Sequence, residues 1–595
     1  MTEVDGSDAP PADDAATAGA DAPTVRVWRD PFVLIAATLV VLPVIAAALS
    51  ALRTQYVPTN DWALIELEVR RVGGGDTPLI GAWSRFGWKH PGPLPFYLLA
   101  GFYRLVPSDR GILFAAAAVN GLAVVGFTAV MMRQTRSRAL MALLGLALVE
   151  KGMGIRQLSD PWNPTLPILP FALYLALCLE VARGNRSRWP MPAALAVASF
   201  VVQAHVGFLQ PVVLTGAAAM ILRGRRLRLE RVEVESADAD ADAPKGWAGL
   251  KSRIKWRPTL VSAGVVAVLW LPTLIDQVNG TGNMGTLIRW SLGDEQAAAG
   301  GMGGGNTDGR LPIDRVLNAG AWLLEPFGLW LGRFRPLVFA GYPLMGRGEV
   351  LSLLWIPAII VVTWAVIRLG RPGDADRRAV TAALVLAGVG VVSVWTDLLS
   401  ARGIAVFWPF RWAITVVMLL WVALGWAVVG ALARRFAWID GPIRWRQFQP
   451  GPIAAGAVAV ITIAVPIYAA LFSGSLGSRP EQVSSAALLR LRSTIVENAG
   501  QEDLVVVNTT VMFNPDDLGL PVVLDRAGIP WVDHSDPRAG SHDRYNVLPA
   551  SDLNGLTGAA IALGMVELLG RSGPPRPGEP PDSELILIRA PGPPP

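Results

Sequence analysis

Long apolar runs alternate with short polar segments along most of this chain. The first run covers about residues 32 to 52, and the others are centred near positions 121, 144, 174, 198, 215, 267, 359, 388, 421 and 462. A helix that spans a membrane needs about 20 apolar residues. The pattern therefore predicts an α-helical polytopic membrane protein with about eleven transmembrane helices.

Basic residues follow the same alternation. Lys and Arg gather before the first run and in the loops 132–138, 183–189, 223–257, 368–378 and 433–447. Because short loops rich in Lys and Arg stay in the cytoplasm, we expect a cytoplasmic N-terminus in the plasma membrane. The opposite loops and everything after about residue 473 are then expected to be extracytoplasmic.

Three segments fall outside the pattern of spans. Residues 1–30 are rich in Asp, Ala and Pro and predict a disordered cytoplasmic tail. Within the transmembrane domain, 31–472, the insert 223–257 indicates a solvated cytoplasmic linker. In 473–595, helical periods at 483–497 and 515–527 and apolar strands at 504–507 and 585–588 predict a small extracytoplasmic α/β domain with a Pro-rich tail.

The composition agrees with this organisation. Of 595 residues, 52% are hydrophobic and 17% are charged, which is typical of a polytopic membrane protein with soluble appendages. The net charge of +5 is explained by the basic loops and requires no nucleic acid partner. The single cysteine, Cys178, excludes a disulfide framework. Abundant Ala, Gly, Val, Pro and Arg suggest a high-GC bacterial genome.

The first outer loop, 53–110, has the most unusual sequence of the chain. Read as a helix, its start places Trp62, Ile65 and Val69 on one face, and Asp61 and Glu68, seven residues apart, on another. This spacing predicts a helix that lies on the membrane and presents acids.

Two acids of this helix allow more than one interpretation. Asp61 can act as a general base at the membrane surface, or it can stabilise the first turn of the helix as a cap. Glu66 is spaced to form a surface ion pair with Arg70, four residues later.

The same loop continues with a rigid turn, Lys89-His90-Pro91-Gly92-Pro93, and an apolar run from Phe96 to Val106 that is too short to cross a bilayer. A side chain fixed beside such a turn can contact a phosphate or donate hydrogen bonds. His90 is therefore a candidate for such a role, with a plain turn residue as the alternative.

Later segments bring further polar residues to the same side of the membrane. Asp160 and Asn163 each precede a proline, which is typical of turns, yet Asp160 beside Arg156 can also complete a charged cleft with Asp61. No zinc-ligand spacing and no Gly-x-Ser-x-Gly motif occurs in the sequence.

The ends of two later spans add candidates on that side. Gln203 and His205 end an apolar run, where a histidine is either a satisfied structural residue or part of a site. Arg402 and Arg411 flank an outer loop with nearby tryptophans. They either extend to lipid headgroups or form a cationic seat for a lipid phosphate.

These motifs and the layout of 32–472 resemble the GT-C superfamily of polyprenyl-phosphate-sugar-dependent glycosyltransferases, especially its aminoarabinose-transferase and protein O-mannosyltransferase branch. In that family a span is followed by a long outer loop with a catalytic acid near its start, as Asp61 is here. A His-Pro motif then precedes a short apolar segment, as in Lys89-His90-Pro91, and a second acid lies in a later loop, as Asp160 does. Two departures occur: Trp62 follows the first acid where the family often has Glu, and the turn continues Gly-Pro instead of Pro-Pro.

The resemblance implies transfer of a sugar from a polyprenyl-phosphate donor to a cell-envelope glycan or glycolipid, with Asp61 as general base and inversion at the anomeric carbon. It implies that the donor phosphate is bound by Lys89, Arg156, Arg402 and Arg411. It implies that the substrates are positioned by Glu66, Glu68, His90, Asp160, Asn163, Gln203 and His205. It implies no cofactor with certainty, a divalent cation (Mg or Mn) stays open, and membrane lipids are expected partners. Together with the composition, the resemblance favours an actinobacterial source.

Two other functions stay open from the sequence. A transporter or flippase of lipid-linked precursors usually has ionisable residues near the middle of the membrane, whereas the runs here are nearly free of internal charge. A non-catalytic envelope-assembly scaffold would use the C-terminal domain as its platform for partners.

Overall fold

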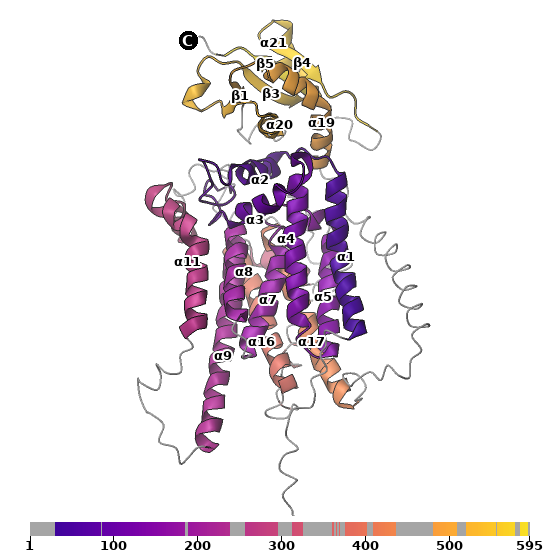
Figure 1. Ribbon diagram of the computed structural model, residues 1–595, viewed down its shortest axis with the longest axis vertical. Coiled ribbons are helices and arrows are strands. Elements are labelled where there is room, and N and C mark those ends of the chain that lie inside the picture. The colour runs from indigo at the N-terminus through magenta and orange to yellow at the C-terminus, as the bar shows by residue number, and fades with distance from the viewer. Residues whose placement is uncertain are drawn as a thin grey trace, which may run out of the picture.

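In a computed structural model the chain forms a bundle of helices with a small α/β domain at one end (Figure 1). The structure describes residues 30–84, 86–184, 189–237, 256–294, 312–324, 375–401, 408–435, 480–507, 519–554, 556–576 and 584–592, with isolated residues between 357 and 368. The predicted fold class, helical and polytopic with a small C-terminal α/β domain, is confirmed.

Helices α1 to α17 form the bundle and the segments at its ends. In chain order they are α1 (Pro31–Arg53), α2 (Asn60–Arg71), α3 (Leu94–Tyr103), α4 (Ser108–Met131), α5 (Arg136–Met153), α6 (Ile155–Leu158), α7 (Ile168–Ala182), α8 (Pro190–Ala204), η2 (Val206–Phe208), α9 (Leu209–Ala237), α11 (Trp256–Asn279), α12 (Asn283–Ser291), α13 (Ile313–Leu323), α16 (Ala375–Ser400), η4 (Trp408–Phe410) and α17 (Ala413–Arg435). Helix α9 extends into the predicted linker 223–257, whose residues 238–255 lie outside the described part.

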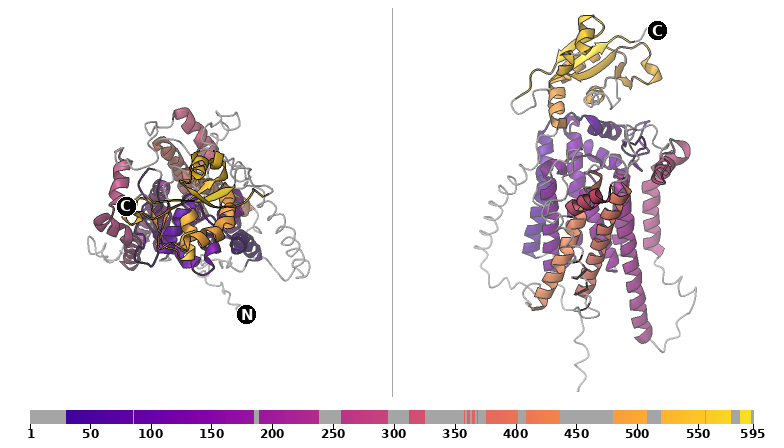
Figure 2. Two further views of the ribbon diagram at one scale, coloured as in Figure 1. Left: turned by 90° about the horizontal axis from the view of Figure 1, so that it is seen from above. Right: turned by 180° about the vertical axis from the view of Figure 1, so that it is seen from behind.

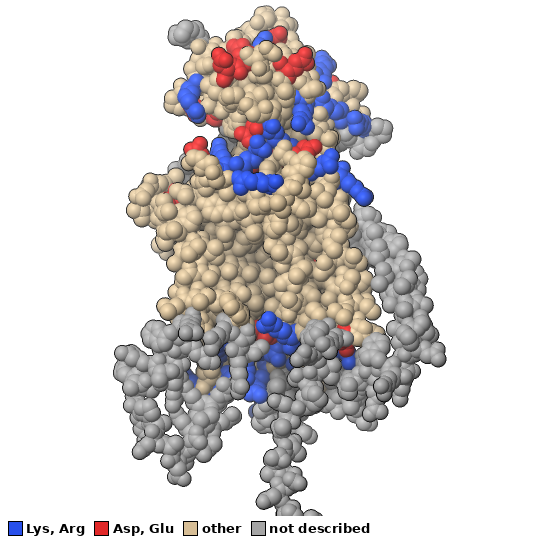
Figure 3. All heavy atoms as spheres, viewed as in Figure 1, with Lys and Arg blue, Asp and Glu red and all other residues tan. Residues whose placement is uncertain are grey.

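Six helices among the described residues are long and apolar enough to cross a membrane. They are Pro31–Arg53, Ser108–Met131, Val206–Arg228, Pro258–Asn279, Arg377–Ser400 and Ala413–Gly430. The predicted runs near 144, 174 and 198 are present as α5, α7 and α8, while those near 359 and 462 fall almost wholly outside the described residues. A broad uncharged band separates the charged ends of the molecule (Figure 3), as expected for a protein whose sides contact lipid.

Small residues let the helices of the bundle approach closely. A Cβ on Gly145 of α5 would lie 2.8 Å from Val422 of α17, and a Cβ on Gly425 of α17 would lie 2.3 Å from Met141 of α5. Each helix therefore contributes a glycine to the same interface. Such close packing is a main source of stability between helices in a membrane, where lipid is as apolar as the core.

The C-terminal domain is a five-stranded sheet covered by helices. Its elements are α19 (Pro480–Ala499), β1 (Val505–Val507), α20 (Gly519–Ala527), β2 (Trp531–Asp533), η6 (Pro537–Ala539), β3 (Arg544–Pro549), η7 (Ala550–Asn554), α21 (Leu556–Ala562), β4 (Glu567–Arg571) and β5 (Leu585–Ala590). The strand order is β2-β1-β3-β5-β4, with β1 parallel to β2 and β3, and β5 antiparallel to β3 and β4. Leu488, Leu491 and Ile495 share the inner face of α19 and pack into its core.

This domain lies on the end of the bundle, directly over α2 and α3 (Figures 1 and 2). Val57, in the segment before α2, is buried within the core of the C-terminal domain. The helix that the sequence predicts on the membrane surface is therefore enclosed between the bundle and a second domain. The local periodicity of α2 cannot predict that a second domain covers it, because the covering residues lie more than 400 positions later in the chain.

Candidate active site

Helix α2 carries the acids of the first loop, and two of its faces are used for packing. Ala63 and Leu67, four residues apart, pack against Val522 of the C-terminal domain. Ile65 and Val69, also four apart, belong to the core of the bundle. The helix is thereby held from both sides.

A cavity of about 210 Å³ lies against the third face of α2. Asp61, Leu64 and Glu68 face it at helical spacing, which confirms that Asp61 and Glu68 share a face. The complete lining is Asp61, Leu64, Ile65, Glu68, Gly81, Ala82, Trp83, Lys89, Phe96 and Asn163. A second, small cavity of about 10 Å³ shares Asn163 with this one and is lined on its other side by Gln203. Four predicted site residues, Asp61, Glu68, Lys89 and Asn163, are thus brought to one cavity.

The backbone before Asp61 has a special conformation. Asn60 has a φ of 54°, in the left-handed region, and among the described residues it is the one non-glycine with positive φ. Asparagine tolerates this region better than most residues. The turn at Asn60 places Asp61 in the first turn of α2, where burial raises the pKa of its carboxyl.

Two tryptophans join the two acids of the outer loops. Trp162 Nε1 donates to Asp61 Oδ2 (2.9 Å), and Trp62 Nε1 donates to Asp160 Oδ1 (2.7 Å). The two indoles stack, with ring centroids 5.0 Å apart. Each loop thus supplies one acid and one donor to the other loop. This exchange ties the loop of Asp160 to the helix of Asp61, but neither Asp160 nor Arg156 lines the cavity, so the charged cleft stays a prediction.

Lys89 reaches the cavity from a short hairpin. Residues 83 and 89 pair in antiparallel register, and Gly87 (φ 85°) lies in the turn between them. Asn283 then holds the backbone of Lys89 on both sides, because its Oδ1 accepts from Lys89 N and its Nδ2 donates to Lys89 O, each at 2.8 Å. The ammonium group is therefore carried on a fixed stretch of backbone.

The Pro-Gly-Pro turn that follows is closely packed at Gly92, where no side chain fits. A Cβ on Gly92 would lie 2.3 Å from Gln203 Oε1 and 2.7 Å from Thr273 Oγ1. Gln203 Oε1 also accepts from Leu94 N at the start of α3 (3.1 Å), and its Nε2 donates to Leu269 O (2.9 Å). Gln203 thus links the turn to α8 and α11.

His90 and His205 form a buried pair of neutral rings. Each Nδ1 accepts a backbone hydrogen bond, from Val206 N for His90 (3.2 Å) and from Gly207 N for His205 (3.1 Å). An accepting Nδ1 leaves the proton on Nε2. Burial, together with repulsion from His205, holds the pKa of His90 well below its usual range, and burial lowers the pKa of His205 to about 4. Neither ring lines the cavity.

The remaining cationic candidates lie at different distances from the acids. Arg411 donates to Thr165 Oγ1 (2.8 Å), and its guanidinium lies 5.3 Å from the ring of Trp162, so one indole separates it from Asp61. Arg156, on α6, is exposed and does not line the cavity. Arg402 lies outside the described residues.

Glu66 points away from the cavity. The pair with Arg70 suggested by their spacing is not formed; Glu66 contacts Arg526 of the C-terminal domain at 2.7 Å, and Arg70 pairs with Asp525. Both side chains of the Glu66–Arg526 pair are buried, at 0% and 3% exposure. Tertiary contacts with α20 have replaced the local pairing.

Within the part of the chain that the structure describes, no group of three or more His, Cys, Asp or Glu side chains is placed to hold a metal ion. A divalent cation in this site stays a prediction.

The chain is similar to solved structures, although not to any family model. No protein-family model and no curated protein matches the chain. Among solved structures, the chain is similar to ArnT from Cupriavidus metallidurans, solved with undecaprenyl phosphate bound. The identity is 13%, the match covers 93% of this chain and 97% of that chain, and the TM-score is 0.47. The function proposed below rests on the residues of the cavity.

Sequence reasoning missed the residues that hold the site together. Trp162 and Asn283 contact Asp61 and Lys89 from other loops, and Arg526 contacts Glu66 from the C-terminal domain. One signal was available, since an indole lies within two residues of each acid in Asp61-Trp62 and Asp160-Pro161-Trp162. For Asn283 and Arg526 the sequence carries no local signal.

Proposed function

We propose that this protein is a membrane glycosyltransferase that moves a sugar from a polyprenyl-phosphate donor to a hydroxyl of a cell-envelope glycan or glycolipid. The observation that carries the proposal is the shared cavity: Asp61, with a raised pKa, and Lys89 line one space at the end of an apolar bundle. The order of Asp61 and the Lys89-His90-Pro91 turn, which resembles the GT-C family, also supports it.

The position of the cavity suits a donor with a lipid tail. It lies against α2, at the end of the bundle that the C-terminal domain covers (Figure 1). A long isoprenoid can remain in the membrane while its phosphate and sugar reach this level. Lys89 would contact the phosphate, and Arg411 would add positive charge behind Trp162.

In the proposed reaction the acceptor oxygen attacks the anomeric carbon. The bond between that carbon and the phosphate oxygen breaks, and polyprenyl phosphate leaves with the electron pair. The hydroxyl proton passes to Asp61, which must be ionised to accept it. One in-line displacement inverts the configuration of the anomeric carbon. A phosphate is a good leaving group, so cationic stabilisation is needed and a strong general acid is not.

The neighbouring residues take supporting roles in this proposal. Glu68 and Asn163 line the cavity and would position the sugar or the acceptor. Asp160 would hold the loop of Trp162, and with it the hydrogen bond to Asp61. His90, Gln203 and His205 would support the turn that precedes α3. In this proposal the C-terminal domain and the cavity are extracytoplasmic.

The test is transfer from radiolabelled polyprenyl-phosphate sugars in membranes that carry the wild-type chain or Asp61→Asn, matched for protein level. Loss of the base should lower transfer by at least about 100-fold. Asp536→Asn, which changes an acid of the C-terminal domain that does not line the cavity, is the matched control and should retain transfer.

Full transfer by folded Asp61→Asn would contradict the role of Asp61. If the wild-type chain consumes no donor across several sugars, the activity itself is wrong, and transport or envelope assembly becomes the better interpretation.

A further inference from the structure

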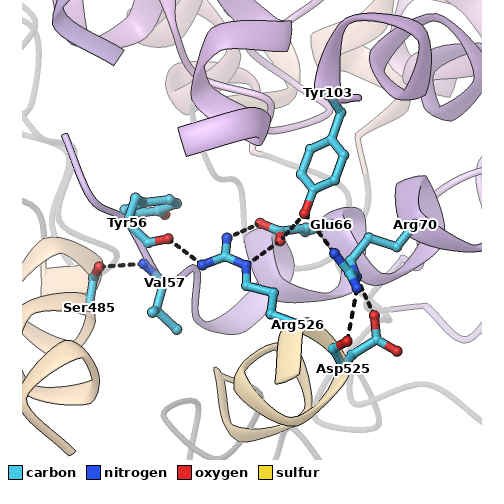
Figure 4. A network of polar contacts seen from close by, with 8 residues as sticks. All are labelled: Tyr56, Val57, Glu66, Arg70, Tyr103, Ser485, Asp525 and Arg526. Carbon is cyan, nitrogen blue, oxygen red and sulfur yellow. Dashed lines mark hydrogen bonds and ion pairs between the residues drawn. The ribbon is translucent and has the colours of Figure 1, made fainter. Parts of the chain in front are cut away.

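The C-terminal domain contacts the helix of Asp61 through a buried polar network (Figure 4). Arg526 donates two parallel hydrogen bonds to Glu66, from Nε to Oε1 (2.8 Å) and from Nη2 to Oε2 (2.7 Å). Its Nη1 donates to the backbone oxygen of Tyr56, just before α2 (2.8 Å). One guanidinium thus holds both α2 and the chain that leads into it. Such a two-pronged contact fixes direction as well as distance.

Further contacts extend this network on either side. Tyr103 of α3 donates to Glu66 Oε1 (2.9 Å) and accepts from Arg70 Nη1 (3.0 Å). Arg70 in turn donates to the backbone oxygen of Asp525 (2.9 Å). Tyr103 thus links Glu66 to Arg70, and the network joins α2, α3 and α20.

Helix α20 runs alongside α2 in the same chain direction. At its start, a Cβ on Gly519 would lie 3.2 Å from Thr59, immediately before α2. At its end, Arg526 meets Glu66. Contacts at both ends of α20 fix the rotation of α2 as well as its position.

The rotation of α2 decides what faces the cavity. Glu66 lies five residues after Asp61 on the same helix. The direction of the Glu66 side chain toward Arg526 therefore fixes the direction in which Asp61 points. If α2 turned about its axis, Asp61, Leu64 and Glu68 would leave the cavity together. The face that packs on the C-terminal domain and the face that carries the acid are thus coupled.

We propose that Arg526 is a positioning residue for the transfer reaction, which acts through Glu66 to hold Asp61 toward the cavity. This inference rests on the proposed function for its effect on activity, but its structural half can be measured without any activity. The C-terminal domain then completes the active site rather than only covering it.

The structural half is tested by thiol labelling at the cavity face of α2. Leu64 lines the cavity and packs beside Val522 and Trp531 of the C-terminal domain, and the native Cys178 is buried. In Leu64→Cys, labelling by a membrane-impermeant maleimide should be slow. Adding Arg526→Gln should speed it at least fivefold, because α2 is released. Arg538→Gln, which changes an exposed arginine of the same domain, is the matched control and should leave the rate unchanged.

The catalytic half is tested by the rate and pH profile of sugar transfer per folded molecule. Arg526→Gln should lower kcat at least tenfold and move the acid limb of the profile to lower pH, since a released Asp61 is better hydrated. Arg526→Lys retains the charge and should recover part of kcat. A role in stability alone would reduce the amount of folded protein and leave both kcat and the profile unchanged.

The outcomes separate the two proposals. If labelling at position 64 does not change in Arg526→Gln, the positioning role is overturned even where transfer is measured. If labelling speeds up and kcat per folded molecule stays at the wild-type value, the positioning role is also overturned. If labelling speeds up and the wild-type chain transfers no sugar, the hold on α2 stands and the proposed function fails. Should Arg526→Gln not fold, Glu66→Gln tests the same contact from the side of α2.

Discussion

Two features of its surroundings shift the pKa of the Asp61 carboxyl in opposite directions. Burial raises the pKa of its carboxyl, while the hydrogen bond from Trp162 favours the ionised form and lowers that pKa. Burial is the larger effect. Asp61 must be ionised to act as the proposed base. As the pH is lowered, transfer should therefore begin to fall at a higher pH than it would with an ordinary aspartate.

Removing the hydrogen bond from Trp162 should move the acid limb of the pH–rate profile to still higher pH. In Trp162→Phe the ring stack with Trp62 can persist, but Asp61 Oδ2 loses its donor. The pKa of Asp61 then rises, and the acid limb of the transfer rate should shift upward by about one to two pH units, since a hydrogen bond to a charged group contributes about 1.5–3 kcal/mol. The measurement is the transfer rate between pH 4 and 9.

Trp62→Phe is the control for this shift. It removes the donor to Asp160 and leaves the bond to Asp61 in place, so the limb should stay where it is in the wild-type profile. An equal shift in both variants would mean that the stack, and not the hydrogen bond, sets the pKa.

At the scale of elements, the turn before α3 is the most tightly packed part of the site. Gly92 lies against Gln203 and Thr273, so no side chain fits there without displacing α8 or α11. Because Lys89 stands three residues earlier on the same stretch, a displacement of the turn would also move the proposed phosphate contact.

Gly92→Ala should therefore destabilise the protein by about 1–3 kcal/mol through overpacking, and lower transfer in parallel. Gly101→Ala is the matched control on α3: a Cβ there meets nothing within 4 Å, and alanine favours helix, so stability should be unchanged or slightly higher. Thermal unfolding of each purified variant in detergent measures its stability, and the assay with radiolabelled donor measures its transfer. Equal unfolding temperatures for the two variants would contradict the packing argument.

Sequence reasoning succeeded at this scale where the signal was local. The spacing of Asp61 and Glu68 predicted their shared face, and the periods in 483–497 and 515–527 predicted α19 and α20. It failed for Glu66 because a spacing rule sees only Arg70, four residues away. A partner 460 residues later outcompetes it, since burial between two domains strengthens the pair with Arg526.

On the face that Figure 3 shows, an uncharged band separates two charged ends, and the positive-inside rule predicts that the end of α9 is cytoplasmic. The C-terminal domain should be accessible from outside the cell, and the end of α9 from inside. Six spans are evident among the described residues, so the sequence predicted the class of fold more securely than the number of spans.

This orientation can be checked with single cysteines, because the native Cys178 is buried. Ser535→Cys, exposed on the C-terminal domain, should react with an impermeant maleimide in intact cells. Arg225→Cys, exposed on α9, should react only after the membrane is permeabilised. The reverse pattern would place the cavity in the cytoplasm and exclude an extracytoplasmic acceptor.

The distance along the chain between Glu66 and Arg526 also sets an order of assembly. A ribosome adds about 5–20 residues per second, so the first outer loop is translocated roughly 20 to 90 s before its partner is made. During that interval Glu66 lacks Arg526 and has only Arg70, four residues later, as a local partner, and α2 has no second domain to hold it. A nascent chain halted after its last span would then sit in the membrane without consuming donor. Under the proposed function, this contact would make transfer depend on completion of the C-terminal domain.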